Sequence, residues 1–89
     1  MICFYKKSFL KDLLDLPTAY RRKIETLVFE SIPASDNISE NLDVKKIQGY
    51  AGYYRIRIGN YRIGCEMRSG NEIIFYRVKN RKDIYRIFP

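Results

Sequence analysis

The sequence predicts an α+β domain: an antiparallel meander sheet plus an N-terminal strand, with a helical hairpin packed on one face and a short C-terminal helical turn. Residues 53–58 and 61–68 alternate apolar and polar side chains around a two-residue Gly-Asn loop, which is a strong hairpin pattern. Residues 9–28 carry apolar side chains at helical spacing. Apolar residues make up 46% of the 89 residues, enough for one modest core, so we expect residues 1–89 to form a single domain.

The N-terminal third predicts a strand followed by two helices. Ile2–Tyr5 is a short run suited to a strand, and Ser8 is suited to cap the first helix. Pro17 either ends that helix or begins the second one, and Ile32-Pro33 stops the second. We expect an antiparallel helix pair that covers one face of the sheet, followed by a polar loop over residues 33–41.

The central hairpin places positive charge on one face of the sheet. Its two-residue loop fixes the cross-strand pairs as Ile58–Tyr61, Arg57–Arg62, Ile56–Ile63 and Arg55–Gly64. Arg57 and Arg62 would then repel each other across the strands, and a bound anion would remove that cost. Gly64 leaves room opposite Arg55 where a flat group could lie close. We interpret this face as an anion site, and a solvated basic face is the alternative.

Glu72–Lys79 predicts the last strand, which is entered through a turn at residues 69–71. Simple alternation sends three of its side chains to the apolar face and three to the basic face. The first set is Ile74, Tyr76 and Val78, and the second is Phe75, Arg77 and Lys79. The tail, residues 80–89, is expected to form one helical turn in which Ile84, Ile87 and Phe88 pack and Tyr85 shares a face with Arg81.

The chain is basic, with a net charge of +7 and a pI of about 9.6, and most of its 17 Lys and Arg residues lie from Lys45 onward. Charge of this size is typical of nucleic-acid-binding domains. The sequence has no histidine, and Cys3 and Cys65 alone do not make a zinc site, so we expect no metal and no cofactor. Both cysteines fit free thiols in a reducing cytoplasm, and no apolar run is long enough to span a membrane.

A sheet face that carries arginine, lysine and tyrosine is suited to RNA. Guanidinium groups bind phosphate through two hydrogen bonds, and tyrosine rings stack on unpaired bases. The same charges would stabilise the phosphorane that forms when a ribose 2′-hydroxyl attacks the adjacent phosphodiester. Because arginine stays protonated at pH 7, the candidate proton acceptors are Tyr85, Glu66 and Lys79.

Three segments together resemble the RelE/ParE toxin superfamily, namely residues 46–49, 54–63 and 77–86, and the order of elements matches along the whole chain. The resemblance implies a bacterial or archaeal toxin of a type II toxin–antitoxin system, neutralised by a small cognate antitoxin. It also implies one of two activities. RelE-like members cleave mRNA in the ribosomal A site, whereas ParE-like members poison DNA gyrase.

The resemblance assigns candidate residues as well. Catalytic positions fall on Arg55, Arg57, Arg62, Arg81 and Tyr85, with Lys79 as the alternative to Arg81. RNA contacts are expected from Lys45, Lys46, Arg77, Lys79 and Lys82. Arg62 matches the arginine that stabilises the transferring phosphate, and Tyr85 matches the tyrosine at the scissile nucleotide. Arg55 and Arg57 replace the lysines of the RelE pattern, which removes side chains that could lose a proton, and Asn80 stands where relatives often have histidine.

The leading hypothesis is a RelE-like, ribosome-dependent mRNA endonuclease that inhibits translation in the cytoplasm. The alternatives are a ParE-like DNA gyrase inhibitor and a catalytically silent RNA-binding module. We expect the antitoxin to be acidic, partly disordered and folded over the basic face. If Arg57 and Arg62 are opposed in order to hold an anion, Arg62→Gln should leave stability unchanged or slightly higher while toxicity is lost.

Overall fold

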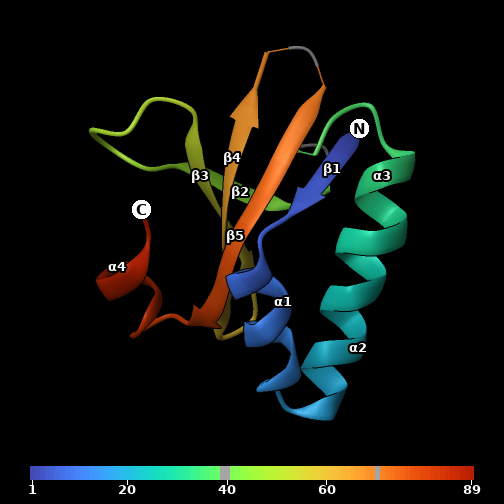
Figure 1. Ribbon diagram of the computed structural model, residues 1–89, viewed down its shortest axis with the longest axis vertical. Helices are drawn as coiled ribbons and strands as arrows, with labels where there is room; N and C mark the ends of the chain where they lie inside the picture. The colour runs from blue at the N-terminus through green and yellow to red at the C-terminus, as the bar shows by residue number, and fades with distance from the viewer. Residues whose placement is uncertain (39–40, 70) are drawn as a thin grey trace.

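The computed structural model describes residues 1–38, 41–69 and 71–89 and shows a five-stranded sheet with helices on both sides (Figure 1). The strands are β1 (Ile2–Tyr5), β2 (Asp43–Lys46), β3 (Tyr53–Ile58), β4 (Tyr61–Arg68) and β5 (Glu72–Asn80). They lie in the order β1-β5-β4-β3-β2, and all neighbours are antiparallel except β1 and β5. Helices α1 (Lys7–Leu14), α2 (Thr18–Thr26) and α3 (Ile32–Ala34) lie on one side and α4 (Ile84–Ile87) on the other (Figure 1). The predicted α+β fold is therefore confirmed.

The hydrophobic core fills the space between the sheet and the layer of α1, α2 and α3. Phe9 and Ile24 from the helices meet Ile56, Ile63 and Phe75 from the sheet, and all five are fully buried. Phe75 stacks on Phe9 with 5.4 Å between ring centroids. The register of β3 with β4 agrees with the prediction at every pair that the Gly-Asn loop was expected to set. The Gly-Asn turn thus predicted the register of the two central strands correctly.

β2 is a strand that the sequence did not predict, since Lys45 and Lys46 were expected only as RNA contacts. It pairs with β3 as a short edge strand. Only Val44 of its four residues packs against the core, so the segment shows almost no apolar alternation. The predicted loop 33–41 includes Ser39 and Glu40, and the predicted turn 69–71 includes Gly70, which lie outside the described residues.

α1 begins two residues earlier than predicted. It starts at Lys7, so Ser8 lies inside its first turn and does not cap it. The Ser8 hydroxyl instead donates to the carbonyl of Tyr76 in β5, at 2.8 Å. The capping prediction was therefore wrong, since this hydroxyl hydrogen-bonds to a strand carbonyl and not to the N–H groups at the start of the helix.

The second helix does not stop at Pro33. It passes through a π-helical segment, η1 (Leu27–Ser31), into α3, and the helical backbone ends at Ala34. The N–H of Ile32 donates to the carbonyl of Leu27, five residues earlier. This wider turn releases the Val28 carbonyl, which accepts a hydrogen bond from the Tyr5 hydroxyl at 2.6 Å. A proline without an N–H is thereby accommodated inside the helical layer.

β5 contains a β-bulge at Tyr76. Gly64 pairs with Arg77, but the next residue of β4, Cys65, pairs with Phe75, so Tyr76 is the extra residue. A bulge shifts the alternation of side chains by one residue along its strand. Predictions that assumed unbroken alternation along β5 should therefore hold on one side of the bulge and fail on the other.

The side chains of β5 follow this expectation. Before the bulge the prediction was wrong: Phe75 is buried in the core, whereas Ile74 pairs with Glu66 and the Tyr76 hydroxyl donates to Glu66 at 2.7 Å on the opposite face. After the bulge it was correct. The correctly placed residues are Arg77, Val78 and Lys79.

α1 continues the edge of the sheet beyond the end of β1. β1 pairs with β5 only as far as Phe75, which leaves the next backbone groups of β5 without a strand partner on that side. The carboxylate of Asp12 accepts a hydrogen bond from the Val78 N–H at 3.1 Å. Together with the Ser8 contact, one turn earlier on the same helix face, this bond ties α1 to β5.

The C-terminal tail folds back over the sheet. Ile84 and Phe88 are buried as predicted, but Ile87 is 40% exposed, so its packing was predicted wrongly. The ring of Phe88 lies directly over Gly64, where an added Cβ would be only 2.4 Å from it. The space opposite Arg55 that was predicted for a flat ligand is therefore filled by an aromatic ring of the chain itself.

Both cysteines are free thiols, as predicted. Burial raises the pKa of the Cys65 thiol to about 12, so it stays protonated at neutral pH. Among the described residues, no helix is long and apolar enough to cross a membrane, and no three His, Cys, Asp or Glu side chains form a cluster that could hold a metal ion.

Replacing Asp12 with Asn should destabilise the fold, because the Val78 N–H and two cations would lose a charged acceptor. We expect a loss of about 2 kcal/mol and a melting temperature lower by roughly 10 °C, measured by circular dichroism. Asp15→Asn, an exposed change at the end of the same helix, is the control and should shift melting by about 2 °C or less.

The same variants predict a pH dependence. The pKa of Asp12 lies below its ordinary value of 3.8 in the folded state, so its stabilisation is present above that value and is lost as the pH falls through the folded pKa. Wild type should therefore lose more stability in this acid range than Asp12→Asn does. Parallel acid profiles for the two proteins would contradict the role given to Asp12.

Gly64→Ala should displace the Phe88 ring and lower stability by about 2 kcal/mol, roughly the free energy of burying one large apolar side chain. In a Phe88→Ala background the added methyl group meets no ring, so the double variant should melt no lower than Phe88→Ala alone. Additive losses in melting temperature would show that Gly64 is needed for some other reason.

Candidate nucleic-acid interface

The basic face is the side of the sheet opposite α1, α2 and α3. Its cations include Lys45, Arg55, Arg57, Arg62, Arg77 and Lys79. The cross-strand pairs arrange the face in two adjacent rows. One row is Lys45, Arg55, Gly64 and Arg77, and the other is Asp43, Arg57, Arg62 and Lys79. Arg57 and Arg62 stand opposite each other, as predicted.

Two carboxylates neutralise much of this charge. Asp43 lies beside the guanidinium groups of Arg55, at 3.2 Å, and Arg57, at 3.9 Å. Asp12 accepts two hydrogen bonds from Arg77, at 2.7 and 3.1 Å. The RNA-binding role predicted for Arg77 therefore has a structural competitor, since its guanidinium already holds a carboxylate in the two-bond geometry that a phosphate would use.

Lys79 is held by the same buried carboxylate, with its Nζ 3.3 Å from Asp12 Oδ1. Burial alone would raise the pKa of Asp12, but hydrogen bonds from Arg77 and the Val78 N–H, with the charge of Lys79, hold it below its ordinary value. Sequence reasoning missed Asp12, although an acidic residue between Phe9 and Leu13 on an apolar helix stripe is an available signal for a buried ion pair.

Arg62 binds the turn next to it. Only 9% of the residue is exposed, and its Nη1 donates to the carbonyls of Gly59 at 2.8 Å and Tyr61 at 3.0 Å. These bonds direct the guanidinium of Arg62 toward the turn that precedes its strand. The two carbonyl oxygens thus offset part of its repulsion from Arg57. The structure therefore gives Arg62 a structural role, which differs from the anion site that the opposed arginines suggested.

A pocket of about 240 Å³ lies beside the tail, and we call it the Tyr85 pocket. Its lining residues are Lys45, Lys46, Ile47, Gln48, Arg55 and Tyr85. Arg55 and Tyr85, two predicted catalytic residues from distant parts of the chain, meet here with two lysines predicted to contact RNA. Tyr85 is 58% exposed, so its phenol is accessible to a ligand in the pocket.

Besides Arg62, Arg77 and Lys79, three more of the predicted residues lie outside this pocket. Arg81 and Lys82 line a separate hollow of about 320 Å³ with Asn60 and Asn80. α4 begins only at Ile84, so Arg81 is in the turn before the helix and does not share a helix face with Tyr85. Arg57 is exposed in the row beside Asp43. The structure thus divides the predicted site between the Tyr85 pocket and its surroundings.

The structure also sorts the candidate proton acceptors. Glu66 accepts a hydrogen bond from Tyr76, which together with Arg68 holds the pKa of that carboxyl below its usual range. Lys79 faces Asp12. Tyr85 is the candidate that lines a pocket together with a predicted catalytic arginine.

Asn80 shapes the approach to α4. Its side-chain carbonyl accepts hydrogen bonds from the N–H groups of Lys82 and Asp83, and its amide donates to the Asp83 carboxylate at 3.0 Å. Asparagine commonly closes turns in this way. At this position the side chain therefore sets the direction of the tail that carries Tyr85.

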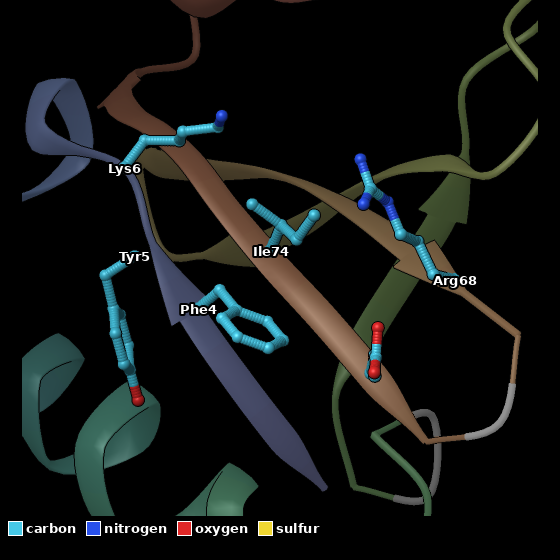
Figure 2. A pocket seen from close by; sticks show the side chains of 6 residues that line it. Phe4, Tyr5, Lys6, Arg68 and Ile74 are labelled. Atoms are coloured by element: carbon cyan, nitrogen blue, oxygen red, sulfur yellow. The ribbon is translucent and has the colours of Figure 1, made fainter.

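A further pocket, of about 350 Å³, lies on the same side of the sheet but away from the predicted residues. Figure 2 shows Phe4 and Ile74 side by side on β1 and β5, with Lys6 and Arg68 at the rim. Tyr5 also borders it, but its ring points the other way, toward the helical layer. There the Val28 carbonyl accepts a hydrogen bond from the Tyr5 hydroxyl. Apolar and basic side chains line this pocket, and none of them was predicted for catalysis.

Comparison with known proteins agrees with this architecture. Residues 4–85 match the family model described as the ParE toxin of the parDE type II toxin–antitoxin system. Toxin RelE3 of Methanocaldococcus jannaschii is 48% identical over 90 residues, covering all of both chains.

Two solved structures have the same fold. In a RelB–RelE antitoxin–toxin complex from Methanococcus jannaschii, the matched chain has a TM-score of 0.82 and 46% identity, with 97% of this chain and 99% of that one covered. In a RelE–RelB complex from Pyrococcus horikoshii the TM-score is 0.63 at 28% identity, with 90% and 93% covered. Since the family model spans most of the chain and a RelE toxin is similar along its whole length, the chain belongs to the RelE/ParE family of type II toxin–antitoxin toxins.

Proposed function

We propose that this toxin is a ribosome-dependent mRNA endonuclease that inhibits translation in the cytoplasm. The observation that carries the proposal is the Tyr85 pocket, in which an exposed tyrosine joins an arginine and two lysines. A pocket of this composition is suited to a phosphodiester, because the cations offset charge and the phenol can take part in proton transfer. We infer no cofactor for the reaction.

The proposed step is attack within the RNA. The ribose 2′-hydroxyl gives its proton to a base that the ribosome supplies as its oxygen forms a bond to phosphorus. The bond from phosphorus to the 5′-oxygen breaks and that oxygen gains a proton, so the products are a 2′,3′-cyclic phosphate and a 5′-hydroxyl. Arg55 and Lys45 stabilise the charge that develops on the phosphate oxygens. To Tyr85, the exposed phenol of this pocket, we assign the proton that the leaving oxygen gains. Arg57, Arg81 and Lys82 bind phosphates of flanking nucleotides.

We also propose that a cognate antitoxin neutralises the toxin, because two similar solved structures are RelB–RelE complexes. A partner that covers the basic face needs acidic side chains to meet the cations that remain exposed, among them Lys45 and Arg57. An acidic, partly disordered segment that folds on binding has this chemistry.

A second candidate is inhibition of DNA gyrase, since the family model that matches the chain is a ParE toxin. Arginine at positions 55 and 57 is also compatible with a surface that binds without cleaving, including a silent RNA-binding module. A translating extract and a supercoiling assay separate the three activities. Cut mRNA with intact gyrase function supports the proposal, whereas intact mRNA with inhibited gyrase supports the ParE-like activity.

Tyr85→Phe should lower the rate constant of mRNA cleavage by roughly 10²–10⁴-fold, the usual contribution of a general acid or base. The measurement is primer extension on mRNA in ribosomes at saturating toxin. Arg86→Gln, an exposed change in the same helical turn, is the control and should cleave at the wild-type rate. Equal rates for Tyr85→Phe and wild type would remove Tyr85 from the chemistry.

Arg62→Gln should lower the free energy of unfolding by about 1–2 kcal/mol, because two turn carbonyls would lose their donor. The sequence predicted the opposite, namely an unchanged or slightly higher stability. That prediction considered only the repulsion between Arg62 and Arg57. Thermal melting measures it, with the exposed Arg57→Gln as the matched control, which should be neutral or slightly stabilising. A melting temperature unchanged in Arg62→Gln would restore the anion-site interpretation.

A further inference from the structure

A second pocket on the basic face, of about 340 Å³, is lined by aromatic rings and lies on the other side of the tail from the Tyr85 pocket. We call it the aromatic pocket, and its walls include Tyr50, Tyr53, Tyr76, Arg77, Ile87 and Phe88. The two pockets are walled by the same two segments. Gln48 and Tyr85 border the first, and Tyr50 and Ile87 border the second. Because residues two apart in each segment border different pockets, the two pockets lie close together on either side of the tail.

Three packed rings form a fixed part of the wall. The ring centroids of Tyr53, Tyr76 and Phe88 lie 5.7–5.8 Å from one another. Phe88 is held against Gly64, and the Tyr76 hydroxyl is held by Glu66 at 2.7 Å. Rings fixed by their own contacts need no reordering before a ligand binds, which favours affinity.

Tyr50 stands at the edge of this cluster with a different character. It is 53% exposed, and its ring meets Tyr53 edge-on, with centroids 6.4 Å apart and planes at 63°. Its loop turns at Gly49 and Gly52, both with φ of +84°, a conformation that favours glycine. The loop thus presents a large exposed ring beside an apolar pocket, on the face where positive charge is concentrated.

We propose that the aromatic pocket takes one nucleobase of the RNA, from a nucleotide next to the one whose phosphate lies in the Tyr85 pocket. This inference rests on the proposed function and adds a base-binding subsite to it. The positive charge of the surrounding face favours a polyanion, and the aromatic walls favour a flat ring. A nucleotide has both a phosphate and a flat base. Stacking of this kind accepts any base, since every base has a π-face.

The test measures binding of a short fluorescent single-stranded RNA by anisotropy across a range of salt concentrations. Bare RNA stays intact because the proposed cleavage needs the ribosome. Tyr50→Ala should weaken binding by roughly 5- to 100-fold without changing the slope of log affinity against log salt. Lys45→Ala should make that slope shallower by about 0.7, the value for one phosphate contact on a single strand. Tyr50→Phe, which keeps the ring, should bind as wild type does.

An RNA with a single abasic nucleotide, moved along the oligonucleotide, shows whether a base is the ligand. At one position the abasic RNA should bind wild type as weakly as normal RNA binds Tyr50→Ala, and Tyr50→Ala should lose nothing further there. Equal losses on normal and abasic RNA at every position would overturn the subsite. So would a Tyr50→Ala protein that binds RNA normally but fails to bind its antitoxin, because the pocket would then serve a protein side chain.

The two proposals fail in different ways. Salt-dependent binding of RNA by wild type, weakened in Lys45→Ala but not in Tyr50→Ala, would overturn the subsite alone. No RNA binding by wild type at low salt would also overturn the subsite, whereas the proposed function fails if mRNA stays intact in the translating extract. Melting curves check the variants, and the exposed Tyr50→Ala should unfold within a few degrees of wild type.

Discussion

The Asp12 carboxylate is the contact on which the layout of this toxin depends. β1 is too short to cover the whole edge of β5, and α1 completes that edge through Asp12, which binds the Val78 N–H and two cations of the basic face. A buried carboxylate needs such partners, and the cations are fixed in return. Because Arg77 and Lys79 are committed here, the charge available to a ligand lies toward β2 and β3, and the candidate site is displaced to that edge.

The tail completes this displacement. Phe88 lies over Gly64 at the middle of the sheet, where the row of cations has its gap, and so a ligand cannot lie flat across the centre of the basic face. Two of the described hollows lie beside the tail, one lined by Tyr85 and one lined by Tyr50. The Phe88 ring that covers the middle of the sheet therefore lies between a charged pocket and an aromatic one. In the proposed complex the charged pocket binds a phosphate and the aromatic pocket binds a base.

The sequence was informative where structure is decided locally. The Gly59-Asn60 turn determines the β3–β4 register without help from distant residues, and the apolar stripe of residues 9–28 determines the helical layer. The bulge at Tyr76 could not be predicted from the sequence, because Phe75 and Tyr76 are compatible with either face of the sheet. Which of them faces the core depends on contacts with α1, more than 60 residues away in the chain. The acidic partners were missed for the same reason: Asp12 and Asp43 meet their cations only once the edges of the sheet are assembled.

Arginine at position 55 changes how a site of this kind can work. It holds a phosphate through two donors but keeps its proton at pH 7, so it contributes charge and orientation and not proton transfer. Asp43, at 3.2 Å, further offsets its charge until a phosphate competes for the guanidinium. Proton transfer in the proposed reaction then depends on Tyr85 and on groups that the ribosome supplies. In the proposed reaction, that dependence is a physical reason why RNA would stay uncut until the ribosome completes the site.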